Sequence, residues 1–124
     1  MKMNASRQRR VLEDMVRYSA AIASVVRRGR DEFFDPGDVR NRATIEHYLE
    51  LIGEACQAVG RSFRSSHPDI PWDAMKRFRF DSAHPYDDLA NPVNHEEIWR
   101  FASVELPAIV RLLRTVKVPG GAEH

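Results

Sequence analysis

The first segment of the chain has apolar residues at alternating steps of four and three, which places them along one side of a helix. These positions are Val11, Met15, Tyr18, Ile22 and Val25. Ser6 is a suitable N-cap, and Gly29 is suited to the end of a helix. We therefore expect one long helix between Ser6 and Gly29, with its apolar side packed against other helices.

A second helix is predicted from about Asp38 to Val59, ending at Gly60. Its apolar positions again step by three and four: Ile45, Tyr48, Ile52, Ala55 or Cys56, and Val59. Residues 30–38 form the loop before it, with a Pro-Gly turn. We expect Phe33 and Phe34 to attach this loop to the core.

The rest of the chain predicts two further helices. Pro71 can begin a third, which would carry Trp72, Met75 and Phe78, because the first turn of a helix does not need the missing N–H. A polar loop with prolines at 85 and 92 follows. Asn94 and Glu97 then have the spacing of a capping box. The fourth helix begins there, and Pro107 is expected to kink or split it.

No stretch alternates between apolar and polar residues for long enough to predict a strand. The fold class is therefore all-α, an up-and-down bundle of four to five helices. The length of 124 residues fits one domain. We expect that domain to cover residues 1–118, with a frayed tail at 119–124.

Composition is typical of a packed domain, with 43% hydrophobic and 30% charged residues. The one cysteine, Cys56, excludes an internal disulfide and fits a reducing compartment. The longest apolar run, residues 20–26, is too short to cross a bilayer. These features predict a cytoplasmic protein without a membrane partner.

The charged residues are unevenly distributed, because the net charge of +1 is the sum of blocks of opposite sign. Residues 1–30 and 59–80 carry net charges of +6 and +3, whereas residues 31–58 and 81–97 carry −5 each. A bundle could display these blocks on different faces. Sixteen of the 19 basic residues are Arg. Arg suits phosphate recognition, but GC-rich codon usage gives the same bias, and both explanations stay open.

The densest group of reactive side chains lies between residues 77 and 86. It contains R-x-x-x-x-H-x-Y, formed by Arg79, His84 and Tyr86. A five-residue step turns a helix by about 140°, so Arg79 and His84 can converge only if the helix ends near His84. Pro85 favours such an ending.

This combination suits the cleavage of a phosphodiester. His titrates near neutrality and can move the proton of a ribose 2′-hydroxyl or of a leaving oxygen. Arg holds the phosphate oxygens, and Tyr can donate a hydrogen bond or stack on a base. Arg77, Asp81 and Ser82 could support the site or bind substrate. Because one His must serve as acid and base, a dimer that pools two motifs is an attractive arrangement.

Spacing alone also allows a simpler interpretation, since an Arg and a His five residues apart are common by chance. The other candidates favour structural roles. His47 is expected to be exposed on a helix, His67 to hold a local turn and His95 to lie within the capping box. Cys56 is expected to lie in the core. The two tryptophans, Trp72 and Trp99, are expected to be core anchors.

An ordered set of short motifs nevertheless resembles one family. The set comprises residues 49–55 (LELIGEA), residues 67–72 (HPDIPW), the R-x-x-x-x-H-x-Y motif, Ile98-Trp99, and Glu105-Leu106-Pro107. Together these motifs resemble the HepT-like ribonuclease toxins, all-α proteins of the HEPN superfamily. The resemblance extends from about Val11 to Leu113, nearly the whole chain.

The resemblance implies a metal-independent endoribonuclease without a cofactor, acting on RNA as a symmetric homodimer. Arg79 and His84 would be catalytic, in a basic cleft where two motifs meet. It also implies a minimal nucleotidyltransferase (MNT) antitoxin as partner, which would neutralise the toxin by transferring AMP onto Tyr86. A bulky anionic nucleotide there would block the cleft and compete for Arg79.

One residue departs from the family pattern. The position after the motif arginine is usually polar, often Asn or Asp, but here it is Phe80. Asp81 or Ser82 could supply the missing polar group. The alternative is a HEPN subunit with weak or no catalysis, which binds nucleotide or substrate for a nucleotidyltransferase.

Overall fold

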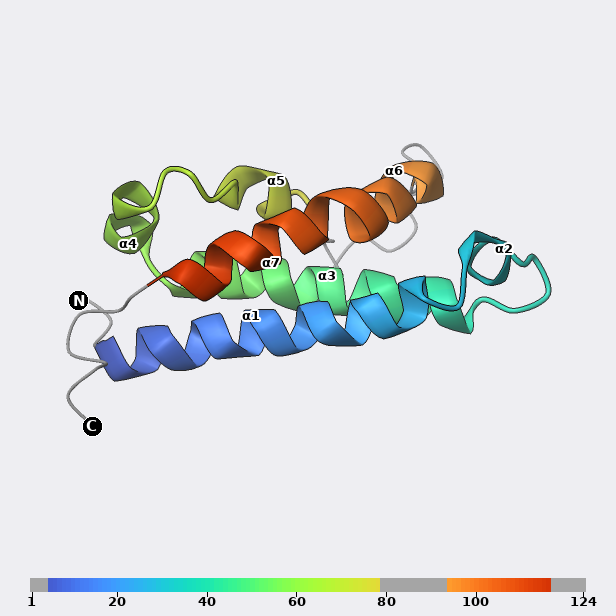
Figure 1. The fold of residues 1–124 in the computed structure, drawn as a ribbon, viewed down its shortest axis with the longest axis horizontal. Helices are drawn as coiled ribbons and strands as arrows, with labels where there is room; N and C mark the ends of the chain where they lie inside the picture. The colour runs from blue at the N-terminus through green and yellow to red at the C-terminus, as the bar shows by residue number, and fades with distance from the viewer. Residues whose placement is uncertain (1–4, 79–93, 117–124) are drawn as a thin grey trace, which may run out of the picture.

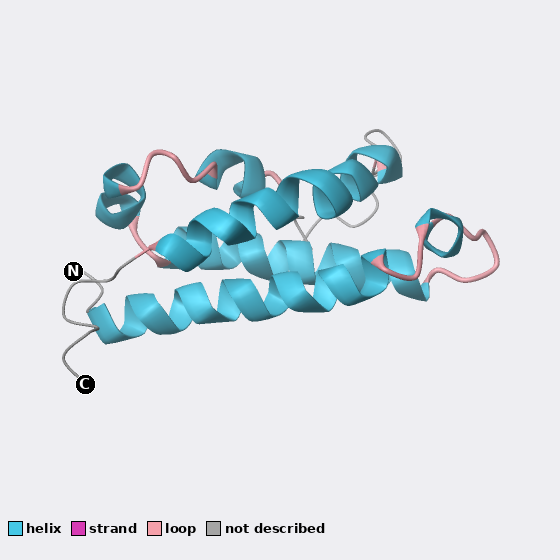
Figure 2. Cartoon of the chain, in the orientation of Figure 1, coloured by secondary structure: helices cyan, strands magenta, loops and turns pink. Residues whose placement is uncertain are grey.

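The fold is known from a computed structural model that describes residues 5–78 and 94–116. Its long helices are α1 (Ala5–Val26), α3 (Arg40–Ala58) and a continuous unit of α6 (His95–Arg100), η2 (Phe101–Glu105) and α7 (Leu106–Thr115). The short helices are α2 (Arg30–Phe33), α4 (Arg61–Ser66) and α5 (Trp72–Lys76). No strand occurs in these two ranges (Figure 2), and the predicted all-α bundle is confirmed for them.

The long helices lie alongside one another, and α1 contacts both α3 and the unit η2–α7. Helix α5 packs on α3, on the same side of the bundle as α4 (Figure 1). The chain reverses direction between α1 and α3, and α7 runs back toward the start of α1. The beginning of α1, the end of α7 and α4 therefore lie at one end of the molecule (Figure 1).

The buried stripe of α1 differs from the predicted one. It consists of Leu12, Met15, Ser19, Ile22 and Val25. The predicted positions Val11 and Tyr18 are only half-buried. Ser19 can be buried because its hydroxyl donates to the carbonyl oxygen of Met15 at 2.8 Å. The sequence pattern missed Ser19 because a hydroxyl counts as polar even when the helix backbone satisfies it.

Helix α3 shows a similar shift. The pattern predicted Tyr48 in the core, but its neighbour Leu49 is the buried residue. Tyr48 lies at the edge of the core and packs against Tyr18, with ring centroids 5.8 Å apart. A tyrosine at the edge buries its ring while its hydroxyl stays near water. The remaining predicted core positions of this helix, including Ile45 and Ile52, are buried as expected.

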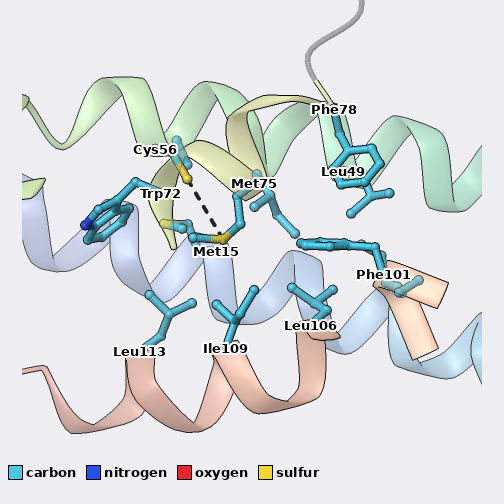
Figure 3. Close-up of a cluster of buried hydrophobic side chains, with 14 of the residues drawn as sticks. Met15, Leu49, Cys56, Trp72, Met75, Phe78, Phe101, Leu106, Ile109 and Leu113 are labelled. Carbon is cyan, nitrogen blue, oxygen red and sulfur yellow. Dashed lines mark hydrogen bonds between the residues drawn. The ribbon is translucent and has the colours of Figure 1, made fainter. Parts of the chain in front are cut away.

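The centre of the core joins side chains from α1, α3, α5, η2 and α7 (Figure 3). Trp72, Met75 and Phe78 are all buried, as the sequence predicts. The ring of Phe78 lies 4.6 Å from that of Phe101. Cys56 is fully buried and its thiol lies 4.0 Å from the sulfur of Met75. Burial raises the pKa of Cys56 to about 12, which fits the predicted core role and not that of a nucleophile.

Three local predictions need correction. The helix already includes Ala5, so Ser6 lies inside α1 and is not its N-cap. Helices α2 and α4 are short turns that the apolar periodicity does not reveal. Pro107 does not split the last helix, because the π-helical turn η2 just before it widens the backbone where the proline ring would clash; the alternative, a kink at Pro107, stays a prediction.

In the described part of the chain, no helix combines the length and the apolar character that crossing a bilayer requires.

Candidate functional site

Most of the predicted site lies outside the described residues. Arg79, Asp81, Ser82, His84 and Tyr86 all fall within residues 79–93, here called the motif segment. The structure describes the residues on either side of it. The described part of the chain stops at Phe78, shortly after α5, and resumes at Asn94, the N-cap of α6.

An ion pair joins the two ends of the motif segment. The guanidinium of Arg77 lies 3.3 Å from the carboxylate of Glu97, in the first turn of α6. Its central carbon also lies 4.9 Å from the ring centroid of Phe78 and 5.6 Å from that of Phe101. These contacts bring the residues that flank the motif segment on its two sides close together. Arg77 therefore lies beside Glu97, two residues before the motif arginine, and its supporting role stays a prediction.

The first turn of α6 is fixed at its beginning and against α3. The side-chain oxygen of Asn94 accepts a hydrogen bond from the backbone N–H of Glu97 at 3.1 Å, which confirms the predicted N-cap. The next residue, His95, places its Nε2 atom 3.2 Å from a carboxylate oxygen of Glu46 in α3. Its ring also meets Phe33 edge-on, with centroids 6.4 Å apart.

Glu96 attaches the same turn to α2. Both of its oxygens pair with the guanidinium of Arg30, one of them at 2.9 Å. These hydrogen bonds lower the pKa of Glu96 and raise that of Arg30. A lowered carboxyl pKa means that the pair stabilises the fold above the ordinary glutamate pKa. That stabilisation is lost as the pH falls through the pKa of the folded state.

Aromatic packing between α2 and α6 supports the first turn of α6. Phe33 is fully buried, and its ring lies 4.8 Å from Phe34 and 5.1 Å from Trp99 of α6. Arg30 lies over the ring of Phe34, 4.3 Å from its centroid. The predicted attachment of this loop through its two phenylalanines is confirmed. Trp99 is half-buried and anchors α6 on them.

Three consecutive residues, His95, Glu96 and Glu97, therefore connect the first turn of α6 to three different parts of the fold. We call this turn the anchor turn. It follows the motif segment in the sequence and is the first described turn after it. Of this turn, the sequence predicted only the cap. The signal for the rest was a row of three charged or titratable residues directly after the cap residue Asn94.

The other histidines have the roles that the sequence favours. The ring of His67 is within 3.0 Å of the carbonyl oxygen of Phe63, a contact within one turn of α4. His47 is exposed on α3. In the described ranges, no three His, Cys, Asp or Glu side chains are grouped so as to hold a metal ion.

Comparison with known proteins places the chain in a family. A sequence model described as Ribonuclease HepT-like matches residues 15–116, which include the bundle except the first ten residues of α1, the motif segment and the anchor turn. The chain belongs to the HepT-like ribonuclease family. The resemblance seen in the short motifs is thereby confirmed.

Relatives of the chain carry related names. It is 29% identical over 72 residues to Probable ribonuclease HepT of Thermococcus cleftensis, covering 58% of this chain and 62% of that protein. It is 28% identical over 86 residues to a Methanocaldococcus jannaschii protein whose name describes it as a candidate RNase. That match covers 69% of this chain and 66% of that protein. The chain thus spans slightly less than two thirds of the length of these two relatives. No solved structure matches the chain significantly.

Proposed function

We propose that this chain is an endoribonuclease that cuts RNA with Arg79, His84 and Tyr86 of the motif segment. The observation that carries the proposal is the family match, which covers the whole motif segment together with the helices that hold it. The names of the relatives support the same activity. The anchor turn supports it structurally, because it fixes the base of the segment that contains all three residues.

The chemistry follows from the three side chains. His84 takes the proton of a ribose 2′-hydroxyl, and that oxygen attacks the adjacent phosphorus. The bond from phosphorus to the 5′-oxygen breaks, and this oxygen takes a proton from an acid. Arg79 binds the phosphate oxygens as charge develops on them, and Tyr86 donates a hydrogen bond or stacks on a base. The products carry a 2′,3′-cyclic phosphate and a 5′-hydroxyl.

Those product ends define the test of the function. The purified chain is incubated with end-labelled single-stranded RNA, once with EDTA and once with magnesium, and the fragments are mapped. We expect cleavage under both conditions, with cyclic phosphate ends. RNA that stays intact under both conditions would overturn the proposal.

The proposal includes a biological setting. The chain is the toxin of a toxin–antitoxin pair, and its partner is a minimal nucleotidyltransferase that transfers AMP to Tyr86. Support comes from the family and from the position of Tyr86, two residues after His84. An adenylyl group at that position adds a negative charge next to the groups that must bind the RNA phosphate.

The site is proposed to be complete only in a homodimer. Each motif supplies one histidine, whereas the reaction needs a base for the 2′-hydroxyl and an acid for the leaving oxygen. Light scattering at micromolar concentration should give the mass of two chains, since a pooled site requires a stable pair. A monomer that cleaves RNA at the full rate would contradict the composite site.

One sequence feature favours a second candidate function. Phe80 follows the motif arginine, where the family usually has a polar residue, and catalysis would be weak if that polar group is needed to orient the histidine. The chain would then bind nucleotide or substrate for a nucleotidyltransferase without cutting RNA. Binding of a nucleotide and of the partner, combined with intact RNA in the cleavage assay, would support this alternative.

The ion pair at the base of the motif segment gives a further prediction. Glu97→Gln should lower the cleavage rate by about three- to tenfold with KM nearly unchanged, because the neutral amide holds Arg77 less firmly and the reactive groups lose alignment. The unfolding free energy should change by less than about 1 kcal/mol, since the pair is partly exposed. Single-turnover kinetics and urea unfolding measure the two effects. An equal loss of rate from Glu54→Gln, at an exposed position of α3, would show that the effect is not specific to the anchor turn.

A further inference from the structure

Three stretches that are far apart in the sequence meet at one end of the bundle: the start of α1, α4 and the end of α7 (Figure 1). Gln8 of α1 donates a hydrogen bond to the carbonyl oxygen of Val59, just before α4, at 3.3 Å. Phe63 of α4 lies 6.1 Å from Trp72, ring to ring. Leu113 of α7 points toward the same tryptophan (Figure 3). The three stretches are therefore joined through shared core contacts.

This end of the molecule is strongly basic. Residues 5–12, 61–66 and 106–115 contain seven arginines and no Asp or Glu. Four of the seven are exposed and make no hydrogen bond or ion pair with any residue that the structure describes: Arg10, Arg61, Arg111 and Arg114. We call these four residues the arginine end. Arg64 is different, because it donates to the carbonyl oxygen of Cys56 at 2.7 Å and closes the end of α3.

Three arginines near the opposite end are already partnered. Arg30 pairs with Glu96 and Arg40 pairs with Asp38, in each case through two hydrogen bonds. Arg28 donates to the buried side chain of Asn41 at 2.9 Å. Arginines that are not paired with a described carboxylate are thus concentrated at the arginine end. Such a concentration is unfavourable by itself and attracts a polyanion.

We propose that the arginine end binds the phosphate backbone of the RNA substrate at a distance from the motif segment. The proposal rests on the ribonuclease function proposed above. A guanidinium group binds a phosphate through two parallel hydrogen bonds, and four of them on three helices can follow a flexible single strand. Helices α4 and α5 lead from the arginine end to Phe78, where the motif segment begins (Figure 1). RNA held at this end would therefore extend along α4 and α5 toward the cleavage site.

The test removes three of the four charges. Binding is measured by fluorescence anisotropy in the His84→Ala background, so that RNA stays uncut. Arg10→Gln, Arg61→Gln and Arg111→Gln together should weaken binding of an RNA of about 20 nucleotides at least about tenfold at about 50 mM salt. The slope of log affinity against log salt should become shallower by about 2, because each of the three lost phosphate contacts contributes about 0.7 to it. An RNA of about four nucleotides should bind as before, because it is too short to contact the motif segment and the arginine end at once.

A control variant removes the same charge elsewhere, through Arg27→Gln, Arg40→Gln and Arg100→Gln. It should keep its affinity for the longer RNA within about twofold and an unchanged salt slope. Circular dichroism confirms that both variants are folded. Equal losses in the two variants, or an unchanged salt slope in the first, would overturn the proposal. If the His84-containing chain leaves RNA intact while the first variant still loses binding, the ribonuclease function fails and the arginine end remains an RNA-binding surface.

Discussion

Replacing His84 with alanine should reduce RNA cleavage by about 10²- to 10⁴-fold, the range that general acid–base catalysis supplies. In the motif, His84 is the side chain whose ordinary pKa lies near neutrality, whereas arginine and tyrosine titrate several units higher. Alanine leaves the 2′-hydroxyl without a base, while Arg79 can still bind phosphate. The rate is measured under single-turnover conditions, so that a change in RNA affinity does not imitate a loss of chemistry.

The matched control for this prediction is His47→Ala. His47 is exposed on α3, so its removal subtracts an imidazole from the same chain without touching the motif segment. The control should keep the cleavage rate and the growth arrest that we expect from induced expression of the intact chain. If His84→Ala arrests growth and cuts RNA as strongly as His47→Ala, the motif histidine is not the catalyst and the proposed mechanism is wrong.

The spacing of apolar residues was enough to predict the bundle, because burial on one side imposes a three–four periodicity whatever the partner helix is. It could not settle which residues at the edge of the stripe are fully buried. Tyr18 and Tyr48 match the pattern but lie at the rim, while Ser19 breaks it and is buried. These outcomes depend on a ring contact between two helices and on a backbone carbonyl four residues away, and neither is encoded in periodicity.

The site shows the same division. Adjacent reactive residues and their order along the chain predicted the motif, and the cap at Asn94 followed from local spacing. The anchor turn could not be predicted, since its contacts join residues as distant as Arg30 and Glu96. The arginine end is likewise a product of the fold. The sequence showed two separate basic blocks, residues 1–30 and 59–80, and only the fold brings parts of them together with the arginines of α7.

Replacing Tyr86 with phenylalanine should free the chain from inhibition by its proposed antitoxin. In the modification step, the phenolic oxygen of Tyr86 attacks the α-phosphorus of ATP, a new oxygen–phosphorus bond forms, and pyrophosphate leaves. The phenolic proton passes to a base of the transferase or to water. Phenylalanine has no oxygen to attack with, so no adenylyl group can be attached. Incubated with the nucleotidyltransferase and ATP, the intact chain should fall below about one tenth of its activity, because the added anion repels the RNA phosphate.

The Tyr86→Phe variant should keep its own activity within about twofold under the same treatment, since it gains no charge. Comparing each variant with and without the partner separates neutralisation from any direct effect of the hydroxyl on cleavage. Tyr48→Phe is the matched control, because Tyr48 packs on Tyr18 in the bundle and should leave both modification and inhibition intact. Intact-mass spectrometry reports one added adenylyl group per chain. If Tyr86→Phe gains that mass and is silenced as before, the acceptor is another residue and AMP transfer to Tyr86 is disproved.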